Sequence, residues 1–296
     1  MIDYRAIECL QAVLQRQGFD KAGQQLGLTQ SAVSQRIKRL EQAFGGPLLI
    51  RSKPIKATPL GERVLAHHHK VALLEQSFLK DALTIESLHS LPISINNDAL
   101  VTWFPSVIAA MPAESNARLH IQAADQSQTR ARLQRGEVIA CVSDIATPVT
   151  GGESVFIGNM HYELVATPDF IKQYLAKGIS KQAIVQCPAL VYDAYDELWQ
   201  RYQETYLDNL ADPLECHWYP SSSGFLSMAL TGTVCALMPS LQVKEALLTG
   251  ALVSLLPQDK LSVALFWHWY KLESYSLDQL THTVITVAKQ TLEGNA

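Results

Sequence analysis

Long apolar runs are missing from this chain of 296 residues. The longest run falls well short of the ~20 residues that a membrane-spanning helix needs, and the opening "MIDYRAIECL" lacks the basic-then-apolar order of a secretory signal. The five cysteines are odd in number, scattered and without C-x-x-C spacing, which argues against a disulfide framework or a zinc site. The sequence therefore predicts a cytoplasmic protein with reduced thiols, no bound metal and no membrane partner.

Catalytic and nucleotide-binding signatures are missing as well. The chain has no G-x-S-x-G elbow, no H-E-x-x-H pair, no phosphate-cradling glycine loop and no dinucleotide fingerprint. His217 and His268 stand beside aromatic residues, and we interpret both as strand residues without an acid–base role. Cys141 and Cys235 lie in apolar segments and are expected to be buried. We therefore predict that the chain is not an enzyme and carries no cofactor.

Acidic residues are scarce at the N-terminal end. Residues 1–70 hold 11 Lys and Arg against five Asp and Glu, a net charge of +6, and the remainder holds 13 against 23, a net charge of −10. A basic head on an acidic body indicates a polyanion-binding module joined to a part with another task. With 48% hydrophobic residues, the chain can bury a sizeable core and is long enough for two or three domains.

Three short helices are predicted in the head. Residues 4–17 carry apolar side chains at helical spacing, and Gly18 is expected to end this helix. A second helix is expected to be capped by Asp20 and stopped by Gly27, and a third to be capped by Thr29. Two short helices joined by a tight turn that contains glycine form the helix-turn-helix layout.

The third predicted helix carries polar and basic side chains opposite its apolar ridge of Val33, Ile37 and Leu40. A helix in the DNA major groove contacts base edges mainly with its N-terminal side chains, and Gln, Ser and Thr can read bases or bond phosphates. The following apolar run and extended return predict a β-wing with a cationic tip. The alternative, a capped helix with an ordinary solvated face, is disfavoured by the preceding helix, the wing and the charge. The predicted DNA-binding residues are Thr29, Gln30, Ser31, Ser34, Gln35, Lys38, Arg51, Lys53 and Lys56.

A long helix is predicted to follow the wing. Thr58 and Pro59 suit a helix cap and first turn. A helix that runs to about residue 90 has little to pack on in its own subunit, so pairing with a second copy is expected. Its successive histidines 67–69 point in different directions, which favours a solvated or dimer-flanking face over a metal site. The apolar stripe consists of Val64, Val71, Leu74, Phe78 and Leu79.

Beyond Pro92, strand-like and helical segments alternate, which predicts an α/β fold with βαβ units. The predicted strands are 92–96, 117–124, 137–143, 153–167, 189–193, 215–220, 233–239 and 262–270. The predicted helices are 99–110, 127–135, 169–175, 196–206, 223–231 and 240–248.

Residues 4–65 resemble the winged helix-turn-helix of the LysR-type transcriptional regulators. The stretch that carries the resemblance is "GFDKAGQQLGLTQSAVSQRIKRLEQAFGGPLLIRS...ATPLGERVL", and the resemblance continues over essentially the whole chain. In that family, Arg51 matches a basic wing residue, and the polar residues named above match positions of the recognition helix.

The resemblance implies an architecture. Residues 1–58 would form the DNA-binding domain, 59–90 a linker and dimerisation helix, and 91–296 an effector-binding domain like the two-lobed (type II) periplasmic binding proteins. Lobe I would comprise about 91–165 and 268–296, and lobe II about 166–267.

A narrower resemblance is to the ArgP subgroup of arginine- and lysine-responsive regulators, carried by "TQSAVSQRIKRLE", "NNDALVTWFP", "TGTVCALMPSLQVKEAL" and "FWHWY". It implies a homodimer or homotetramer on double-stranded DNA, L-lysine or L-arginine as effector, RNA polymerase as partner, and activation of genes for amino-acid export and metabolism. The alternative is an effector-independent DNA-binding protein acting at replication origins or on the nucleoid.

Polar residues follow several predicted strands of the body. Ligands of α/β sheets lie beyond the carboxyl ends of strands, near helix N-termini. Hydroxyls and helix N-termini there suit the carboxylate of an amino acid, and Asp side chains suit a cationic tail. Plain capping is the alternative role for each residue. The predicted effector-binding residues are Asn96, Asn97, Asp98, Asp125, Gln126, Ser127, Ser143, Asp144, Asp193, Ser221, Ser222 and Ser223.

Overall fold

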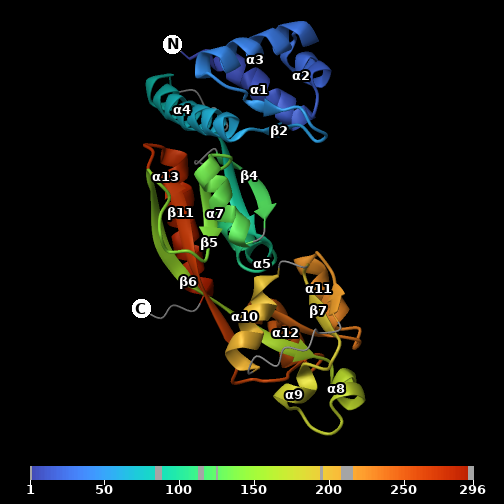
Figure 1. The fold of residues 1–296 in the computed structure, drawn as a ribbon. Helices are drawn as coiled ribbons and strands as arrows, with labels where there is room; N and C mark the ends of the chain where they lie inside the picture. Colours follow the sequence, from blue (N-terminus) through green and yellow to red (C-terminus); the bar gives the residue numbers. More distant parts are fainter. Residues whose placement is uncertain are drawn as a thin grey trace.

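The computed structural model describes residues 2–83, 89–112, 117–124, 126–193, 196–207 and 216–292. An N-terminal head, a long helix and two α/β lobes follow one another along an elongated molecule (Figure 1). The predicted fold class, a winged helix-turn-helix joined through a long helix to a two-lobed α/β domain, is confirmed. Of the predicted residues, Asp125 and the side chains of Gln126, Ser127, Phe78 and Leu79 lie outside the described part of the chain.

The head is a small helical domain with its own core. Buried apolar residues from each helix meet in one cluster that includes Ile7, Leu10, Val33 and Ile37. Its elements are α1 (Tyr4–Arg16), α2 (Phe19–Leu26), α3 (Gln30–Phe44), β1 (Leu49–Ile50) and β2 (Lys56–Ala57).

The helix ends of the head differ from expectation in two caps. Thr29 caps α3, because its Oγ1 accepts a hydrogen bond from Ala32 N at 3.2 Å. Gly27 ends α2 in the left-handed conformation, as predicted. Asp20 does not cap α2: the cap residue is Gly18, and Asp20 lies in the first turn, where its charge favours the positive end of the helix. Gly18 was expected to end α1, but the C-cap of α1 is Gln17, in the left-handed conformation, and Gly18 instead begins α2.

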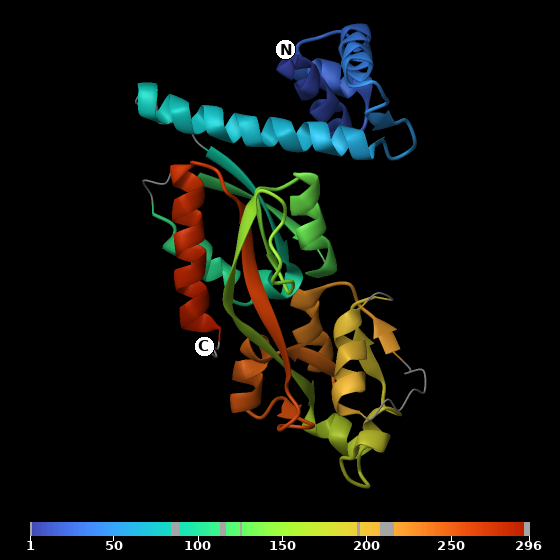
Figure 2. The same ribbon diagram turned by 60° about the vertical axis from the view of Figure 1, so that its left-hand side comes forward.

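The long helix α4 (Pro59–Leu83) begins where predicted, since Thr58 Oγ1 accepts a hydrogen bond from Gly61 N at 3.0 Å. It crosses between the head and the first lobe and contacts both α1 and α7 (Gln126–Arg135) (Figure 2). The expectation that α4 finds little to pack on in its own subunit is therefore wrong for its first half, where Val64 and Ala66 are buried. Leu74, further along, is exposed.

The described strands of the body form one nine-stranded sheet with the order β4-β3-β5-β11-β6-β9-β7-β8, and β10 pairs with β6. β3 is parallel to β4 and β5, and β7 is parallel to β8 and β9. The bounds are β3 (His89–Asn96), β4 (Ala117–Ala124), β5 (Ala140–Ser143), β6 (Gly152–Ala166), β7 (Ala189–Val191), β8 (Cys216–Trp218), β9 (Cys235–Pro239), β10 (Val253–Ser254) and β11 (Leu261–Tyr270).

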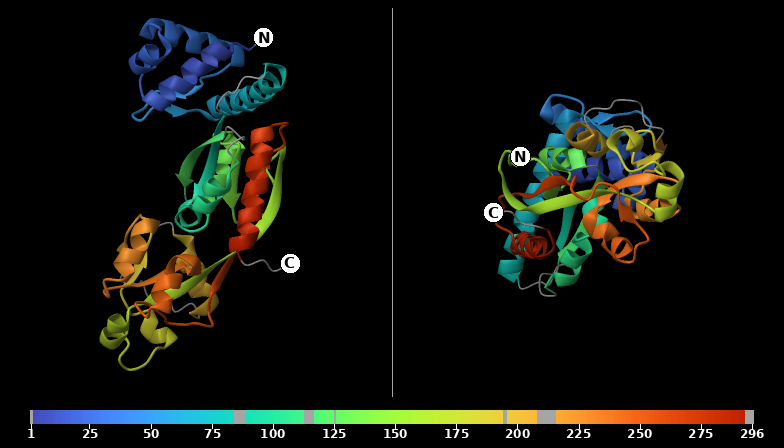
Figure 3. Two further views of the ribbon diagram at one scale, coloured as in Figure 1. Left: turned by 180° about the vertical axis from the view of Figure 1, so that it is seen from behind. Right: turned by 90° about the horizontal axis from the view of Figure 1, so that it is seen from below.

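Two long antiparallel strands, β6 and β11, run through both lobes and pair from Gly152 opposite Tyr270 to Tyr162 opposite Leu261. Lobe I lies at one end of this pair, with β3, β4 and β5, and lobe II at the other, with β7, β8 and β9 (Figure 3). The lobes thus share a two-stranded connection, the geometry needed for one lobe to move against the other.

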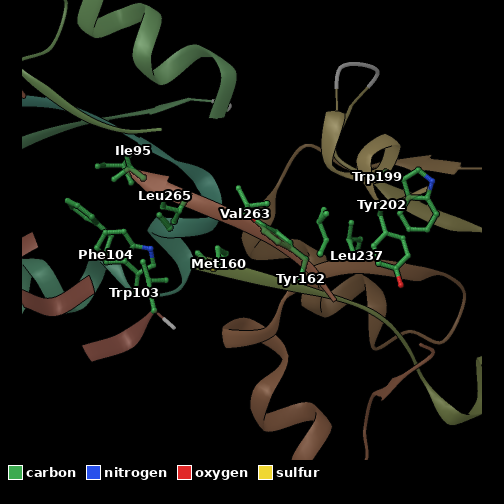
Figure 4. Packing of buried hydrophobic residues seen from close by; sticks show 14 of the residues in the cluster. Ile95, Trp103, Phe104, Met160, Tyr162, Trp199, Tyr202, Leu237, Val263 and Leu265 are labelled. Carbon is green, nitrogen blue, oxygen red and sulfur yellow. The ribbon is translucent and has the colours of Figure 1, made fainter. Parts of the chain in front are cut away.

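Helices cover the sheet in both lobes. Lobe I carries α5 (Asn97–Val101), α6 (Phe104–Ala110), α7 and α13 (Tyr275–Thr291). Lobe II carries α8 (Pro168–Tyr174), α9 (Lys181–Ile184), α10 (Glu197–Tyr206), α11 (Ser222–Ala229) and α12 (Ser240–Leu248). One apolar cluster runs along the shared strands from Trp103 in lobe I through Tyr162 to Trp199 in lobe II (Figure 4).

Three differences from the predicted elements stand out. The single helix expected over 99–110 is broken into α5 and α6, because Pro105, in the first turn of α6, has no N–H to donate to the carbonyl of Val101 at the end of α5. β3 begins at His89, so the linker predicted to end at residue 90 overlaps the sheet. α9, β10 and α13 were not predicted. Cys141 and Cys235 are buried as expected, whereas Cys216 is exposed.

Candidate nucleic-acid interface and ligand pocket

The recognition face is the side of α3 opposite its buried ridge. Val33, Ile37 and Leu40 are buried in the core of the head. On the opposite side, Ser31, Gln35 and Lys38 are exposed, as are Thr29 and Gln30 at the start of the helix, and Ser34 is half-buried. These side chains are therefore available at the leading end of α3, where base contacts are made in helix-turn-helix proteins.

The surroundings of α3 leave this face open. α1 lies between α3 and α4, so that α3 is on the side of the head away from the lobes (Figure 1). α3 packs on α1 and α2. α3 therefore lies on the outer side of the head, away from α4.

The wing presents three exposed cations, Arg51, Lys53 and Lys56. Its position is fixed from α1, because the Gln17 side chain accepts a hydrogen bond from Ile55 N at 2.7 Å and donates one to Ile55 O at 3.0 Å. The Arg51 guanidinium lies 5.3 Å from the centroid of the Phe19 ring of α2, a cation–π contact. The cationic tip is thus held against the helical part of the head.

A pocket with a volume of about 60 Å³ lies between the two lobes and is open to solvent on one side. Lobe I supplies residues from the ends of β3 and β4, and lobe II supplies residues from the ends of β7 and β9 and from its helices. The lining residues are Asn96, Asn97, Asp98, Ala124, Tyr192, Asp196, Ser222, Phe225, Leu237, Pro239 and Gln242.

Hydrogen bonds fix Asp98 and Asn97 at the pocket. The buried hydroxyl of Tyr162, on the shared strand β6, donates to Asp98 Oδ2 at 2.9 Å. Burial and the neighbouring Asp98 carboxylate raise the pKa of Tyr162 well above its usual value, so this hydroxyl keeps its proton and remains a donor. Asn97 Nδ2 donates to the phenolic oxygen of Tyr192 in lobe II at 3.1 Å.

Asn96 is the buried polar residue of the pocket. Its side chain is 3% exposed, and its Oδ1 has no hydrogen-bond partner among the described atoms. A buried acceptor left unpaired costs about 1–3 kcal/mol, and a ligand that donates an N–H to it would recover that cost.

Asp196 contributes a second carboxylate from lobe II. It caps α10, since its Oδ1 accepts from Leu198 N at 3.1 Å, and its Oδ2 accepts from Tyr192 N at 3.0 Å. These backbone bonds orient the carboxylate and hold Tyr192 beside it.

The remaining predicted residues have other places. Ser221 caps α11 by accepting from Gly224 N at 3.2 Å, and the exposed Ser223 bonds to Ser221 at 3.2 Å. The hydroxyl of Ser143, a buried residue, accepts from Ile145 N at 3.2 Å. Asp193 is half-buried and outside the described lining.

Asp144 joins the lobes in a different way from that predicted. Its Oδ2 lies 3.2 Å from Arg201 Nη1 of α10, and both side chains are partly exposed. The pair connects the end of β5 in lobe I with lobe II outside the described lining of the pocket.

Sequence reasoning missed seven lining residues, namely Ala124, Tyr192, Asp196, Phe225, Leu237, Pro239 and Gln242. Tyr192 lies near the end of the predicted strand 189–193, and Asp196 lies at the start of the predicted helix 196–206. Strand ends and helix starts are the positions from which the other pocket residues were predicted. Gln242 lies in the first turn of α12 and bonds to Ser222 O at 2.8 Å, a contact made only when the lobe is folded. Among the described residues, no His, Cys, Asp and Glu side chains form a cluster of three suited to a metal ion.

Histidines 67–69 were expected on a solvated or dimer-flanking face, and the solvated alternative holds only for His67. His67 is exposed, but His68 and His69 are half-buried. His69 Nδ1 lies 2.8 Å from Gly136 O, at the end of α7.

No helix of the described chain is long and apolar enough to cross a bilayer.

Both parts of the chain match known families. Residues 4–62 match the bacterial regulatory helix-turn-helix proteins of the lysR family. Residues 87–290 match the LysR substrate binding domain. The first match includes the exposed face of α3, and the second includes the residues of the inter-lobe pocket.

Similar proteins cover almost the same length. The HTH-type transcriptional regulator ArgP of Yersinia enterocolitica is 35% identical over 290 residues, 98% of this chain and 98% of the relative. The crystal structure of ArgP from Mycobacterium tuberculosis superposes with a TM-score of 0.86 and 29% identity over 100% of both chains. The full-length regulator LysG of Corynebacterium glutamicum with the effector Arg bound gives a TM-score of 0.75 and 29% identity, over 99% of this chain and 100% of that one.

Proposed function

The chain belongs to the LysR family of bacterial transcriptional regulators, and on that premise we propose that its inter-lobe pocket senses a basic amino acid, L-arginine or L-lysine. It is a DNA-binding regulator with an effector domain. The effector bound in the structure of LysG, a relative of 29% identity, is Arg, which supports a ligand of this class.

The observation that carries the proposal is the chemistry of the pocket. Its described lining holds two carboxylates, Asp98 and Asp196, and no cationic side chain, and the buried Oδ1 of Asn96 has no partner. Negative charge together with an unpaired acceptor favours a ligand that is cationic and rich in N–H donors. Guanidinium and ammonium groups have both properties.

The two ends of the ligand would meet different groups. The cationic tail and the α-ammonium group would bind at Asn96, Asp98 and Asp196. The α-carboxylate would lie at Ser222, in the first turn of α11, where backbone N–H groups point outward and the helix dipole favours an anion. Phe225 and Leu237 would contact the aliphatic part of the side chain.

On the DNA side, we propose residues 1–58 as the binding domain, 59–90 as the linker and dimerisation helix, and 91–296 as the effector domain. Thr29, Gln30, Ser31, Ser34, Gln35 and Lys38 would face the major groove, and Arg51, Lys53 and Lys56 the phosphates. A homodimer or homotetramer would act in the cytoplasm, without catalysis, and would activate amino-acid export and metabolism genes through RNA polymerase. The regulators named above support this assignment.

The test is thermal unfolding of the full-length protein with increasing L-arginine or L-lysine. A ligand that binds only the folded state increases the free energy of unfolding by RT ln(1 + [L]/Kd), which is about 2.7 kcal/mol at a ligand concentration of 100 times Kd. The melting temperature rises accordingly. L-Citrulline, the uncharged analogue of arginine, and L-norleucine, which lacks the amine of lysine, are the matched ligands and should produce little change.

Two variants localise the effect. Asp98→Asn and Asn96→Ala should abolish most of the shift, whereas Asp169→Asn should keep it, because Asp169 is an exposed residue of α8. An equal response to arginine and citrulline, or no response to either basic amino acid, would refute the proposed effector.

A further inference from the structure

The turn that follows α7 is the place where lobe I touches the long helix of its own chain. Gly136 has φ +70°, and a Cβ added there would collide with Cβ of Ala66 on α4. Ala66 is buried and is one of the smallest residues that could occupy this position. The two backbones therefore approach as closely as their side chains allow.

Polar contacts surround this apolar contact. His69 Nδ1 donates to Gly136 O at 2.8 Å, and Arg135 Nε lies 3.8 Å from Glu62 Oε1. Lys70 Nζ lies 3.8 Å from the ring centroid of Tyr270, on the shared strand β11. Burial lowers the pKa of Lys70, which agrees with a position inside this contact.

The same stretch of α4 continues into the head. His69 Nε2 lies 3.3 Å from Gln11 Nε2 of α1, and the ring of His67 stacks on Tyr4 with 6.3 Å between centroids. One side of α4 thus contacts lobe I, and another contacts the first helix of the DNA-binding head (Figure 2).

At its other end, α7 begins two residues after a lining residue of the inter-lobe pocket. It follows β4, whose last residue, Ala124, lines the pocket. It is also bound to the strands beside it, since Thr129 Oγ1 donates to Val142 O at 2.6 Å and the Tyr270 hydroxyl donates to Leu133 O. α7 therefore forms a bonded connection between the pocket end of lobe I and the turn at Gly136.

We propose that the turn Arg135–Glu137 is a docking surface for the linker helix of the same chain, through which lobe I transmits effector binding to the DNA-binding head. The docking itself is independent of the effector's identity. Its signalling role relies on the function proposed above, that the pocket between the lobes binds a basic amino acid. The effector in the pocket and the DNA on the head then both act on α4, which couples the two binding sites.

The variants for the test change the contact from both sides. Gly136→Ala places a methyl group against Ala66, and Ala66→Leu enlarges the partner without altering the turn. Gly250→Ala is the matched control: Gly250 also follows a helix and has φ +74°, but no atom lies within 4 Å of its Cβ position. Gly136→Ala and Gly250→Ala therefore share the backbone strain of a left-handed residue, and only Gly136→Ala adds the collision.

Docking is measured first, without ligand, by amide hydrogen exchange of residues 62–70 in the full-length protein. Gly136→Ala and Ala66→Leu should speed exchange there by about tenfold, because α4 loses the tertiary contact that protects it, and Gly250→Ala should not. Unchanged protection in both contact variants would overturn the docking surface, whatever the pocket binds.

Coupling between the pocket and the head is measured next, on DNA fragments that the wild-type protein selects from genomic DNA. The measured quantity is the ratio of the Kd for DNA without L-arginine to the Kd for DNA with L-arginine. Coupling factors of about 5–150 are usual. The contact variants should bring this ratio to within about twofold of one while keeping the arginine-dependent rise in melting temperature. Retention of the wild-type ratio by both would overturn the signalling role. A wild-type protein that is not stabilised by arginine or lysine would instead refute the proposed effector, and the exchange result would still decide the docking.

Discussion

Asn97 of lobe I and Tyr192 of lobe II are joined across the pocket by a hydrogen bond of 3.1 Å from Asn97 Nδ2 to the phenolic oxygen. A second contact between the lobes is the ion pair of Asp144 with Arg201, at 3.2 Å. The lobes therefore meet through polar side chains that line the pocket or lie near it. An effector that needs the lobes together should bind less tightly when such a contact is lost.

Tyr192→Phe removes this inter-lobe bond and keeps the ring that packs near Phe225, at 6.4 Å between centroids. The Kd for L-arginine should rise by about two- to tenfold, the equivalent of about 0.5–1.5 kcal/mol for one hydrogen bond. Isothermal titration calorimetry measures it. Tyr174→Phe, on an exposed residue of α8, should leave the Kd unchanged, and an unchanged Kd in Tyr192→Phe would contradict the role of the bond.

Much of the fold could be predicted because the apolar pattern agrees with the local structure. The strand over 117–124 and the helix over 240–248 were predicted with the bounds that β4 and α12 have. α13 was missed because its inner face is formed partly by Thr283, Val284 and Val287. β-Branched residues lower helix propensity, and only packing on the sheet decides in favour of helix.

The pocket could be predicted only in part. Asn96, Asn97 and Asp98 follow a buried strand directly, and that position was enough to identify them. Asp196 lay at a predicted helix start and could have been identified, whereas Gln242 reaches the pocket because lobe II folds back toward lobe I, a relationship that no local pattern records. For the same reason, the partner of Asp144, Arg201, could not be foreseen.

Gln35→Ala tests the recognition face of α3. Gln35 is exposed on the side opposite Ile37, so its loss should relax base preference at one or two positions of the site by about 1–3 kcal/mol. Selection from a randomised duplex library followed by sequencing measures the preference. Gln42→Ala alters an exposed glutamine near the other end of α3 and should keep the wild-type preference. If both variants select the same sequences as the wild type, the proposed placement of this face of α3 in the major groove is wrong.

Arg51→Ala tests the wing. A phosphate contact carries no sequence information, so this variant should weaken binding to all duplexes alike and reduce the slope of log K against log salt by about 1. Fluorescence anisotropy across a salt series gives the slope. Lys172→Ala removes an exposed cation of lobe II, bound only to Asp169 in an exposed pair, and should leave the slope unchanged. A sequence-dependent loss in Arg51→Ala would argue for base contact instead.

We expect His268 to make the stability of the protein dependent on pH. It is fully buried on β11, its Nε2 donates to Ile145 O at 2.7 Å, and its Nδ1 has no partner among the described atoms. Burial lowers the pKa of His268, and the charge of Arg130 lowers it further, although the bond to Ile145 opposes them. As the pH falls, His268 therefore takes up a proton in the unfolded chain before it does so in the folded chain. The free energy of unfolding is unaffected by the titration of His268 above about pH 6.5 and decreases as the pH falls from there toward the pKa of His268 in the folded chain.

His268→Gln should remove this acid sensitivity, because glutamine can keep an N–H donor for Ile145 O and does not titrate. Between pH 7.5 and 5.5 the wild-type melting temperature should fall further than that of the variant, by about 2–4 °C for each 1 kcal/mol of protonation free energy. Scanning calorimetry at both pH values measures the difference. His217→Gln, on the exposed edge strand β8, should behave as the wild type. A constant gap between wild type and His268→Gln at the two pH values would show that His268 is not the titrating group.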